Sequence, residues 1–573
     1  MRHPEVWSHG AVSARSGVSE STPAPGRCHS AAIAAAALPA AAMKRPLLVA
    51  ALVAPLLLTA APRSPLAHDA GYYALQAHWL AEQGPWLAPL WFGQPLFDRT
   101  PGVQWLIALS LKLAGGAGWA VELPSLLAAA LSLLLTGWLA RRLLPGSPAE
   151  RGRLALLSVL LLALLPLWLN QAHLATQDMP LLAVELAGIA ALVASERQGR
   201  RCWPLLAGLT PGIAFLIKGF MVVVPVLAIT PYLLIERRWL LRRWPFWLGL
   251  ALGWLAVALW LALSIHTYGL ATVAGLWNKL RFLAASDVYA AGPLYYLWNL
   301  PANTAPWILA ALAGWPQLWR SGLERGARLL LLLYPLLLLL LLSAFRTKTP
   351  YYGLQLTPWI AMAAALALRR WSGAARGVAR RPHAAVAAVG AALVGAGVLA
   401  LLPASPLRAL LPAGEGLPAL PPLAAAALAV GGGWLVLPWQ PSPPRRLAAL
   451  LLGPWLALAL LTQAGLFSDR SPALRRALAA PAAGRQLAGR DIQAAVAGPL
   501  PGADHAQLIL LALATPRIPG RLLEPAAVGP GERVWIRRQD LAAAGPWRIV
   551  LDGPALQGWV LAERLTPAPG AAP

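Results

Sequence analysis

Long runs of apolar residues, broken by short polar connections, follow one another along most of the chain. A helix needs about 20 apolar residues to cross the hydrocarbon core of a bilayer, with about 17 to 25 usual. The pattern predicts thirteen such helices, near residues 46–61, 120–140, 153–170, 179–195, 203–218, 219–235, 244–264, 298–315, 328–344, 351–368, 383–403, 422–438 and 446–466. We therefore expect an all-α polytopic membrane protein with about thirteen transmembrane helices.

The residues after the last apolar run have a different character. Residues 467–573 carry 12 arginines and 8 acidic residues, and short alternating segments at 533–536 and 547–551 lie between Gly- and Pro-containing turns. Alternation of apolar and polar positions is typical of strands, and we expect a helix near 471–497. This part of the sequence therefore predicts a small α+β C-terminal domain.

The first residues lack apolar periodicity. Residues 1–42 are rich in Ser, Pro, Ala and Arg, and we interpret them as a disordered extension or as translation from an upstream start codon. Met43, Lys44 and Arg45 then precede the first apolar run, whose positive flank is also typical of a signal peptide. No clear cleavage site follows, so we expect a first transmembrane helix. A mature N-terminus near residues 62–67 would contradict this interpretation.

Composition supports a membrane protein and argues against other classes. Of the 573 residues, 58% are hydrophobic and 12% are charged, against about 25% charged in soluble proteins. A net charge of +25 would suggest nucleic-acid binding in a soluble chain. Here the basic residues form short clusters between apolar runs, so we expect no nucleic-acid partner. Cys28 and Cys202 are too few for a disulfide framework and belong to no CxxC or Cys/His pattern.

The basic clusters also orient the helices, because Arg and Lys accumulate in short cytoplasmic loops. Two predicted helices separate each cluster from the next, and the clusters are Lys44/Arg45, Arg141/Arg142 with Arg151/Arg153, Arg197/Arg200/Arg201, Arg237/Arg238/Arg242/Arg243, Arg320/Arg325/Arg328, Arg369/Arg370/Arg376/Arg380/Arg381 and Arg445/Arg446. This alternation predicts a cytoplasmic N-terminus and places the remaining loops in the periplasm or in the lumen of an organelle. Of these we expect a bacterial inner membrane. The expected parts are a membrane core at 43–370 with an outer loop at 63–119, additional transmembrane helices at 371–466, and a periplasmic domain at 467–573.

Two acidic residues at the predicted outer face are candidate catalytic groups. Asp69 lies in the segment HDAGYY, just after the first helix, and Asp178 lies in ATQDMP, before a later one. A carboxylate at the mouth of a membrane cavity can take a proton from an incoming hydroxyl. An Asp before a helix is also a good N-cap, so spacing alone leaves both roles open.

Basic residues at the same face are candidates for binding an anion. Lys218 has no acidic neighbour in sequence, so it either extends to the membrane interface or faces a cavity that holds an anion. Arg99, in LFDRTPG, can hold a phosphate by a two-point contact or form a local ion pair with Asp98. Carboxylates and several cations around one outer cavity would suit a lipid-linked substrate whose phosphate must be stabilised as it leaves.

Six short segments occur in one order between about residues 66 and 360. They are HDAGYY at 68–73, FDRTPG at 97–102 followed by Trp105-Leu106, ATQDMP at 175–180, FLIKGF at 215–220, Tyr295-Tyr296 with Pro306-Trp307, and RTKTPYY at 346–352. This ordered set resembles the GT-C superfamily of polytopic glycosyltransferases, in the branch that includes protein O-mannosyltransferases and lipid A aminoarabinose transferases. Thirteen helices and an outer C-terminal domain also match that family.

The resemblance implies an inverting glycosyltransferase that moves a sugar from a polyprenyl or dolichyl phosphate to a hydroxyl on the non-cytoplasmic face. Its partners would be that donor, a glycolipid, glycan or protein acceptor, and membrane lipids. By position in the motifs, Asp69 would take the acceptor proton and Asp178 would orient the acceptor or sugar. The resemblance assigns the donor phosphate to Arg99, Lys218, Arg281 and Lys348, and the acceptor or sugar pocket to Tyr72, Tyr73, Asp98 and Tyr351.

The chain departs from the family pattern at three places. Asp69-Ala70 stands where many relatives have Asp-Glu, and Asp98-Arg99 stands for Glu-Lys. Asn278 occupies the position where aminoarabinose transferases place a metal-binding His. We therefore assign no cofactor from the resemblance, and these departures argue against a divalent metal.

A transporter or flippase of lipid-linked sugars is the alternative function, since it would share the helix number and the buried cations. Transporters often contain two related halves with broken helices, and the sequence shows no such internal symmetry. The long outer loop with its carboxylates favours an enzyme. Motif spacing does not specify the sugar or the acceptor.

Overall fold

The computed structural model describes residues 40–566, with gaps at 67, 85, 286–289, 374–375, 404, 406–415 and 544. The chain divides into two compact units, Met1–Arg45 and Pro46–Pro573, and the architecture below is that of the second. The expected disordered extension lies outside the described residues except for residues 40–42, which form the beginning of the first helix.

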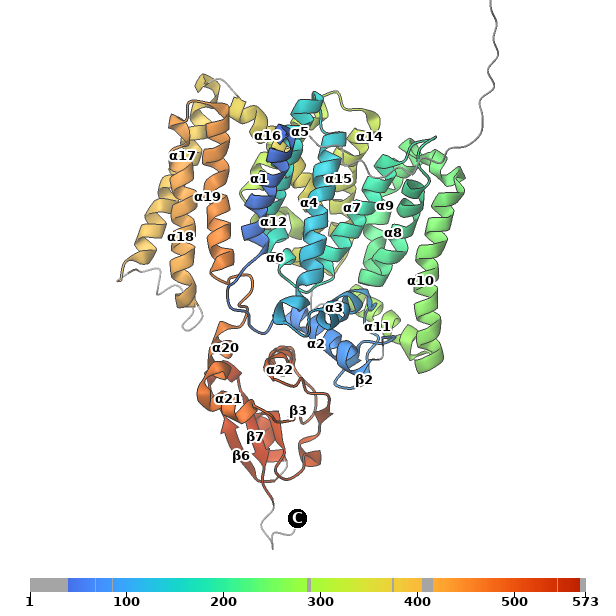
Figure 1. The fold of residues 1–573 in the computed structure, drawn as a ribbon, viewed down its shortest axis with the longest axis vertical. Helices are drawn as coiled ribbons and strands as arrows, with labels where there is room; N and C mark the ends of the chain where they lie inside the picture. The colour runs from blue at the N-terminus through green and yellow to red at the C-terminus, as the bar shows by residue number, and fades with distance from the viewer. Residues whose placement is uncertain are drawn as a thin grey trace, which may run out of the picture. The chain divides into compact units, whose positions relative to one another are not determined.

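Helices make up most of the described chain (Figure 1). The first group is α1 (Ala40–Leu57), α2 (His68–Gln83), α3 (Gly102–Leu113), η1 (Gly118–Val121), α4 (Leu123–Leu143), α5 (Pro148–Ala163), α6 (Pro166–Ala172) and α7 (Asp178–Ala194). The second is α8 (Cys202–Lys218), η2 (Gly219–Val222), α9 (Val223–Glu236), η3 (Arg238–Arg242), α10 (Trp244–Tyr268), α11 (Ala271–Ala285), α12 (Tyr295–Thr304) and α13 (Trp307–Arg320). The third is α14 (Arg325–Arg328), the π-helical η4 (Leu329–Leu333), α15 (Tyr334–Ala344), η5 (Pro350–Leu356), α16 (Thr357–Gly373), α17 (Arg376–Leu401), α18 (Gly416–Leu435), η7 (Leu437–Trp439) and α19 (Pro443–Gln463).

Seven helices of the described residues are long and apolar enough to cross a membrane, or up to eight if the bent pair α5–α6 is one span. They include the continuous stretch Cys202–Glu236, which the sequence predicted as two helices. The expected helices at 179–195 and 351–368 correspond to α7 and α16, of 17 residues each. The expected helix at 298–315 is divided between α12 and α13. The all-α polytopic architecture is confirmed, while the number thirteen stays a prediction.

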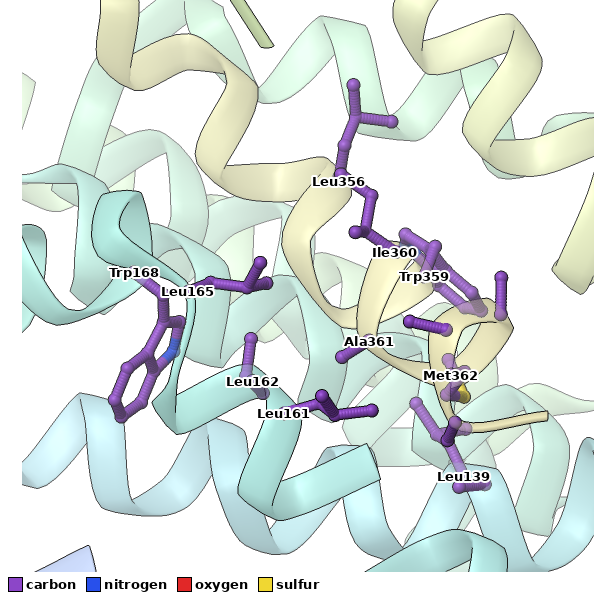
Figure 2. Close-up of a cluster of buried hydrophobic side chains, with 14 of the residues drawn as sticks. Leu139, Leu161, Leu162, Leu165, Trp168, Leu356, Trp359, Ile360, Ala361 and Met362 are labelled. Atoms are coloured by element: carbon purple, nitrogen blue, oxygen red, sulfur yellow. The ribbon is translucent and has the colours of Figure 1, made fainter. Parts of the chain in front are cut away.

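The largest cluster of buried side chains surrounds α16. Its residues from Thr357 to Leu368 are all buried. Figure 2 shows Met362 beside Leu139 of α4, and Ala361 on the side of α16 toward Leu161 and Leu162 of α5. Trp168 of α6 satisfies its indole N–H by donating to Ser132 of α4 over 3.1 Å. An apolar helix buried on every face must be covered by neighbours, so α16 organises the helices around it.

The expected outer loop 63–119 is itself folded. It contains α2, a two-stranded hairpin of β1 (Leu90–Trp91) and β2 (Gln94–Pro95), and α3. In Figure 1 these elements and α11 lie between the long helices and the C-terminal domain. Polar residues in this segment therefore occupy fixed positions at one end of the long helices.

The C-terminal domain is α+β, as predicted. Its sheet has the order β4-β3-β5-β7-β6, with β3 parallel to β4 and β5 and with β7 antiparallel to β5 and β6. The elements are α20 (Pro472–Ala479), α21 (Pro481–Leu487), β3 (Ile492–Ala495), α22 (Gly502–Ala514), β4 (Leu522–Leu523), η8 (Pro525–Ala527), β5 (Arg533–Arg537), η9 (Arg538–Ala543), β6 (Trp547–Leu551), η10 (Pro554–Leu556) and β7 (Trp559–Arg564).

The helix expected at 471–497 is wrong in its second half. Pro481 begins a second short helix, α21, and residues 492–495 then form β3. Ile492, Ala494 and Ala495 are buried there, because β3 has partners on both sides. A buried parallel strand reads as a short apolar run, which periodicity does not distinguish from a helix.

The C-terminal domain packs directly on α2, and its helix α22 makes the contact. A Cβ at Gly71 would lie 2.8 Å from the side chain of Ile509, so the two helices meet at a residue without a side chain. The indole of Trp79 donates a hydrogen bond to the carbonyl of Pro519 over 3.1 Å. Contacts made by this domain therefore fix the helix that carries the motif at 68–73.

Gly102, at the beginning of α3, makes a second close contact. A Cβ there would lie 2.5 Å from the carbonyl oxygen of Leu216 in α8, which is a backbone atom. The contact holds the turn containing Arg99 against the end of α8, where Lys218 lies. Only glycine allows this approach of the two backbones.

We predict that Gly102→Ala lowers the thermal unfolding midpoint in detergent, because overpacking of a tight contact typically costs about 1–3 kcal/mol. Gly152→Ala is the matched control, since no atom lies within 4 Å of a Cβ at that position of α5. Equal midpoints for the two variants in a differential scanning fluorimetry experiment would contradict the close contact.

Candidate active site

One cavity of about 480 Å³ gathers residues from most of the motifs. Its walls come from α2, the turn before α3, the beginning of α7, the end of α8, α11 and the segment that links α15 to η5. The charged residues that line it are Asp69, Asp98, Asp178, Arg99, Lys218, Lys279, Arg346 and Lys348. Five basic and three acidic side chains give the lining a formal charge of +2.

Asp178 and Lys218 meet because α7 and α8 pack side by side. Asp178 is the first residue of α7 and Lys218 is the last residue of α8, and the ammonium donates a hydrogen bond to the carboxylate. Both side chains are 10% exposed. The acidic partner of Lys218 is thus 40 residues away in sequence, and the ammonium faces the cavity rather than the membrane interface.

Two aromatic rings complete the surroundings of Lys218. Its ammonium nitrogen lies 5.2 Å from the ring centroid of Tyr351 and 4.9 Å from that of Tyr352. Cations within about 6 Å of a ring face are stabilised by the ring quadrupole. One carboxylate and two rings therefore hold this cation at the cavity wall.

Arg99 is held by a comparable set of groups from α2 and its own turn. Its Nε donates to Asp98 over 3.1 Å, and its guanidinium lies 4.3 Å and 4.8 Å from the ring centroids of Tyr72 and Tyr73. The hydroxyl of Tyr72 donates to the same carboxylate oxygen over 3.0 Å. Burial alone would lower the pKa of Arg99, but Tyr73 and Asp98 raise it overall, so the group keeps its charge. The expected local ion pair and a position on the cavity therefore coexist.

Neither Asp69 nor Asp178 occupies the residue before its helix. Asp69 lies inside the first turn of α2 and is exposed on the cavity. Gln177 is the N-cap of α7, and no side-chain hydrogen bond is made by that cap. Negative charge in a first helical turn is still favoured by the helix dipole. The N-cap interpretation of Asp178 is therefore wrong, while its position on the cavity agrees with a role toward substrate.

Three further cations line the cavity. Lys348 donates a hydrogen bond to the carbonyl of Phe345, and burial lowers the pKa of its ammonium. Burial, and then the charge of Arg99, lower the pKa of Lys279 on α11. Arg346 lines the same wall. A bound anion would relieve the unfavourable electrostatics of this concentration of positive charge.

Two residues that the resemblance assigned to the substrate sites, Arg281 and Tyr72, do not line the cavity. Arg281 is exposed on α11 and does not line the cavity, so the expectation that it takes part in the cation set is not met. Successive helical residues are rotated by about 100°, which places positions 279 and 281 on different faces and turns Lys279 inward. Tyr72 also does not line the cavity, because its hydroxyl is bound to Asp98 behind the wall. The motif assignment omitted Lys279, Arg346 and Tyr352, each within two positions of an assigned residue.

The described residues contain no group of three or more His, Cys, Asp or Glu placed to hold a metal ion. Asn278, at the position of the family's metal-binding His, is exposed on α11. The carboxylates of Asp98 and Asp178 have basic partners instead. The donor set of the described residues does not fit a divalent metal.

Known proteins resemble parts of this sequence. A model of the family described as dolichyl-phosphate-mannose-protein mannosyltransferase matches residues 98–263. The undecaprenyl phosphate-alpha-4-amino-4-deoxy-L-arabinose arabinosyl transferase of Pseudomonas aeruginosa (strain LESB58) is 32% identical over 283 residues, 47% of this chain and 49% of that protein. The protein of the same name from Edwardsiella ictaluri (strain 93-146) is 27% identical over 300 residues, 50% and 52% of the two chains. The chain thus spans about half the length of the curated relatives it matches.

Solved structures resemble the whole architecture. ArnT from Cupriavidus metallidurans bound to undecaprenyl phosphate aligns with a TM-score of 0.73 at 20% identity, over 93% of this chain and 100% of that one. The apo state of the same protein gives a TM-score of 0.68 at 18% identity, over 91% and 98% of the two chains. This likeness shows that the chain has the same fold. Together the matched segment, the curated relatives and the fold confirm the resemblance to the GT-C superfamily of polytopic glycosyltransferases, in its aminoarabinose-transferase branch.

Proposed function

We propose that this protein is an inverting glycosyltransferase that moves a sugar from a polyprenyl phosphate to a hydroxyl of a lipid, glycan or protein acceptor. The observation that carries the proposal is the cavity, whose lining combines three carboxylates with five cations. The curated relatives are named as transferases that use undecaprenyl phosphate linked to an aminoarabinose. A solved structure of the same fold holds undecaprenyl phosphate. These names favour an enzyme over the transporter alternative.

The charge of the cavity suits the leaving group. A sugar linked through its anomeric carbon to a lipid phosphate carries one negative charge, and the phosphate gains a second when that bond breaks. Catalysis requires contacts that strengthen as this charge develops. A lining with two surplus positive charges complements the dianion that leaves. Lys218, Lys348 and Arg99 are the proposed phosphate ligands, and Lys279 takes the place that the motif assignment gave to Arg281.

The carboxylates have separate roles in the proposal. Asp69 accepts the proton of the acceptor hydroxyl. The hydroxyl oxygen meanwhile bonds to the anomeric carbon on the face opposite the phosphate, which inverts the configuration at that carbon. Asp178 already accepts a hydrogen bond from Lys218, so it orients the acceptor or sugar and also fixes Lys218. Tyr73, Asp98 and Tyr351 complete the acceptor or sugar pocket, and Tyr72 acts behind it by holding Asp98.

The proposed orientation puts this cavity and the C-terminal domain in the periplasm and the arginine clusters in the cytoplasm. α8 supports a test, because it begins at the exposed thiol of Cys202, beside Arg200 and Arg201, and ends at Lys218 on the cavity. The two ends of this 17-residue helix are about 25 Å apart.

In a Cys28→Ser background, Cys202 should react with a membrane-impermeant maleimide only after intact cells are lysed. Glu524→Cys, at an exposed position of the C-terminal domain, should react in intact cells when Cys202 is also replaced by Ser. The reverse pattern, read by gel shift, would place the cavity on the cytoplasmic face.

Asp69→Asn should reduce the turnover number by about 10²- to 10⁴-fold, the usual contribution of a general base. The measurement is transfer of labelled sugar from a synthetic prenyl phosphate sugar by purified protein. Glu82→Gln is the matched control, because Glu82 is exposed near the other end of α2 and does not line the cavity. Full transfer by a folded Asp69→Asn variant would remove Asp69 from the mechanism.

Lys218→Gln should raise the donor KM by about tenfold or more and change the acceptor KM much less, because a hydrogen bond to a charged group contributes about 1.5–3 kcal/mol. Lys112→Gln is the control, since that ammonium lies over Trp86 outside the cavity.

The single Lys218 variant also leaves Asp178 without its partner, which can unfold the protein. The double variant Lys218→Gln with Asp178→Asn removes both charges and should recover the thermal midpoint while the donor KM stays high. Donor kinetics equal to the unmodified protein in the folded double variant would exclude Lys218 from the phosphate site.

A further inference from the structure

A second cavity, of about 920 Å³, lies at the other end of the helices that carry the first. α7 begins at Asp178 on the first cavity. Val193 at its other end lines the second cavity, as do Ser195, Glu196 and Arg197 just beyond that end. α9 begins just beyond Lys218, and its last turn up to Glu236 lines the second. A helix of 14 residues is about 21 Å long. The two cavities are therefore separate sites.

Arginines from different loops converge on this second cavity. Its charged lining residues are Arg142, Arg197, Arg237, Arg238, Arg325, Glu196, Glu236 and Glu324, with a formal charge of +2. Preference for arginine in cytoplasmic loops is expected from topology. That preference does not explain why five arginines surround one cavity. They come from the ends of α4, α7 and α9 and from the beginning of α14.

Two of the arginines build the wall. Arg237 donates from Nε to the carbonyl of Leu192 over 3.1 Å and from its terminal nitrogen to that of Val193 over 3.2 Å. It thereby satisfies carbonyls at the end of α7, which have no partner within their own helix. Arg325 pairs with Glu236 over 3.0 Å and ties α14 to α9. These contacts give the cavity fixed sides.

The other three arginines are available to a ligand. Arg142, Arg197 and Arg238 are exposed, and within the described residues none of them forms an ion pair with an acidic side chain. The guanidinium of Arg142 lies over Trp138 at 5.2 Å from the ring centroid, which orients it without neutralising it. Guanidinium groups bind phosphate oxygens by two parallel hydrogen bonds.

The rim of the cavity is apolar on one side. Leu234 and Ile235, in the last turn of α9, line it and are 51% and 46% exposed. Trp239 lines it beside them, and tryptophan is enriched where hydrocarbon meets headgroups. A free phosphate would leave these side chains unused, whereas acyl chains of a lipid would cover them.

We propose that this cavity binds the headgroup of an anionic phospholipid from the leaflet opposite the glycosyl-transfer site. The phosphate contacts Arg142, Arg197 and Arg238, and the acyl chains lie against Leu234 and Ile235. Basic pockets between the cytoplasmic ends of transmembrane helices are suited to such headgroups. The site is distinct from the donor site and does not depend on the proposed reaction.

The test is lipid retention by purified, delipidated protein in native mass spectrometry, with phosphatidylglycerol, phosphatidylcholine and inorganic phosphate as separate probes. The triple variant Arg142→Gln, Arg197→Gln and Arg238→Gln should bind phosphatidylglycerol about a hundredfold more weakly, since each arginine near an anionic headgroup contributes roughly fivefold in affinity. Phosphatidylcholine should bind weakly to both forms.

The control triple is Arg141→Gln, Arg200→Gln and Arg242→Gln. It removes the same charge from exposed positions of the same loops that do not line the cavity, and it should retain phosphatidylglycerol as the unmodified protein does. Three results would each overturn the proposal. They are an equal loss of phosphatidylglycerol binding in the two triple variants, retention of phosphatidylcholine equal to that of phosphatidylglycerol by the unmodified protein, and retention of inorganic phosphate but of neither lipid. Thermal midpoints of both triples show that they are folded.

Discussion

The ion pair between Asp178 and Lys218 is the contact on which the arrangement of the first cavity depends. It joins the beginning of one buried helix to the end of the next, where neither charge has free access to water. Removing one partner of a buried pair costs about 3–5 kcal/mol, because the other charge remains without compensation. The pair therefore fixes the relation of α7 to α8. It also places an ammonium beside Tyr351 and Tyr352, from a segment more than 130 residues later in the chain.

A second part of the cavity lining, at Asp98 and Arg99, depends on the C-terminal domain. Tyr72 lies at 5.5 Å from Trp91, and Trp91 lies at 4.7 Å from His505 of α22, measured between ring centroids. The hydroxyl of Tyr72 holds Asp98, which in turn holds Arg99. A chain of contacts thus runs from a helix of the C-terminal domain to a cation of the cavity. The domain supports the position of α2 and its neighbours, in addition to any contact with substrate.

Motif order predicted much of the cavity, because the motifs sit at helix ends and helix ends meet at one level of a bundle. Asp69, Arg99, Asp178, Lys218 and Lys348 do line one space. The prediction failed where the outcome depends on which face of a helix a residue occupies. For α11 a shift of two positions exchanged Arg281 for Lys279, because the sequence of this helix does not indicate which of its faces points inward.

Helix boundaries were less predictable than helix existence. Hydropathy identifies apolar length, but it does not indicate that α12 ends before a new helix, α13, whose N-cap is Pro306, or that α5 and α6 are bent by 68°. The strand β3 was also missed, since a segment of only four residues, three of them apolar, becomes a strand only when neighbouring strands are available on both sides. These features are set by tertiary contacts, and local sequence carries little information about them.

The two cavities have the same formal charge but differ in their share of lysine, since the first combines three lysines with Arg99 and Arg346. Three of the five lysines in the chain line the first cavity, and the basic residues of the second are all arginines. Lysine is a compact point charge that can follow a phosphate as its charge and position change, whereas the planar fork of arginine favours one fixed geometry. A site that must release its phosphate after each reaction is better served by lysine. A site that holds a resident lipid is better served by arginine. The greater share of lysine in the first cavity thus agrees with an anion that reacts and leaves, and the arginines of the second agree with an anion that stays bound.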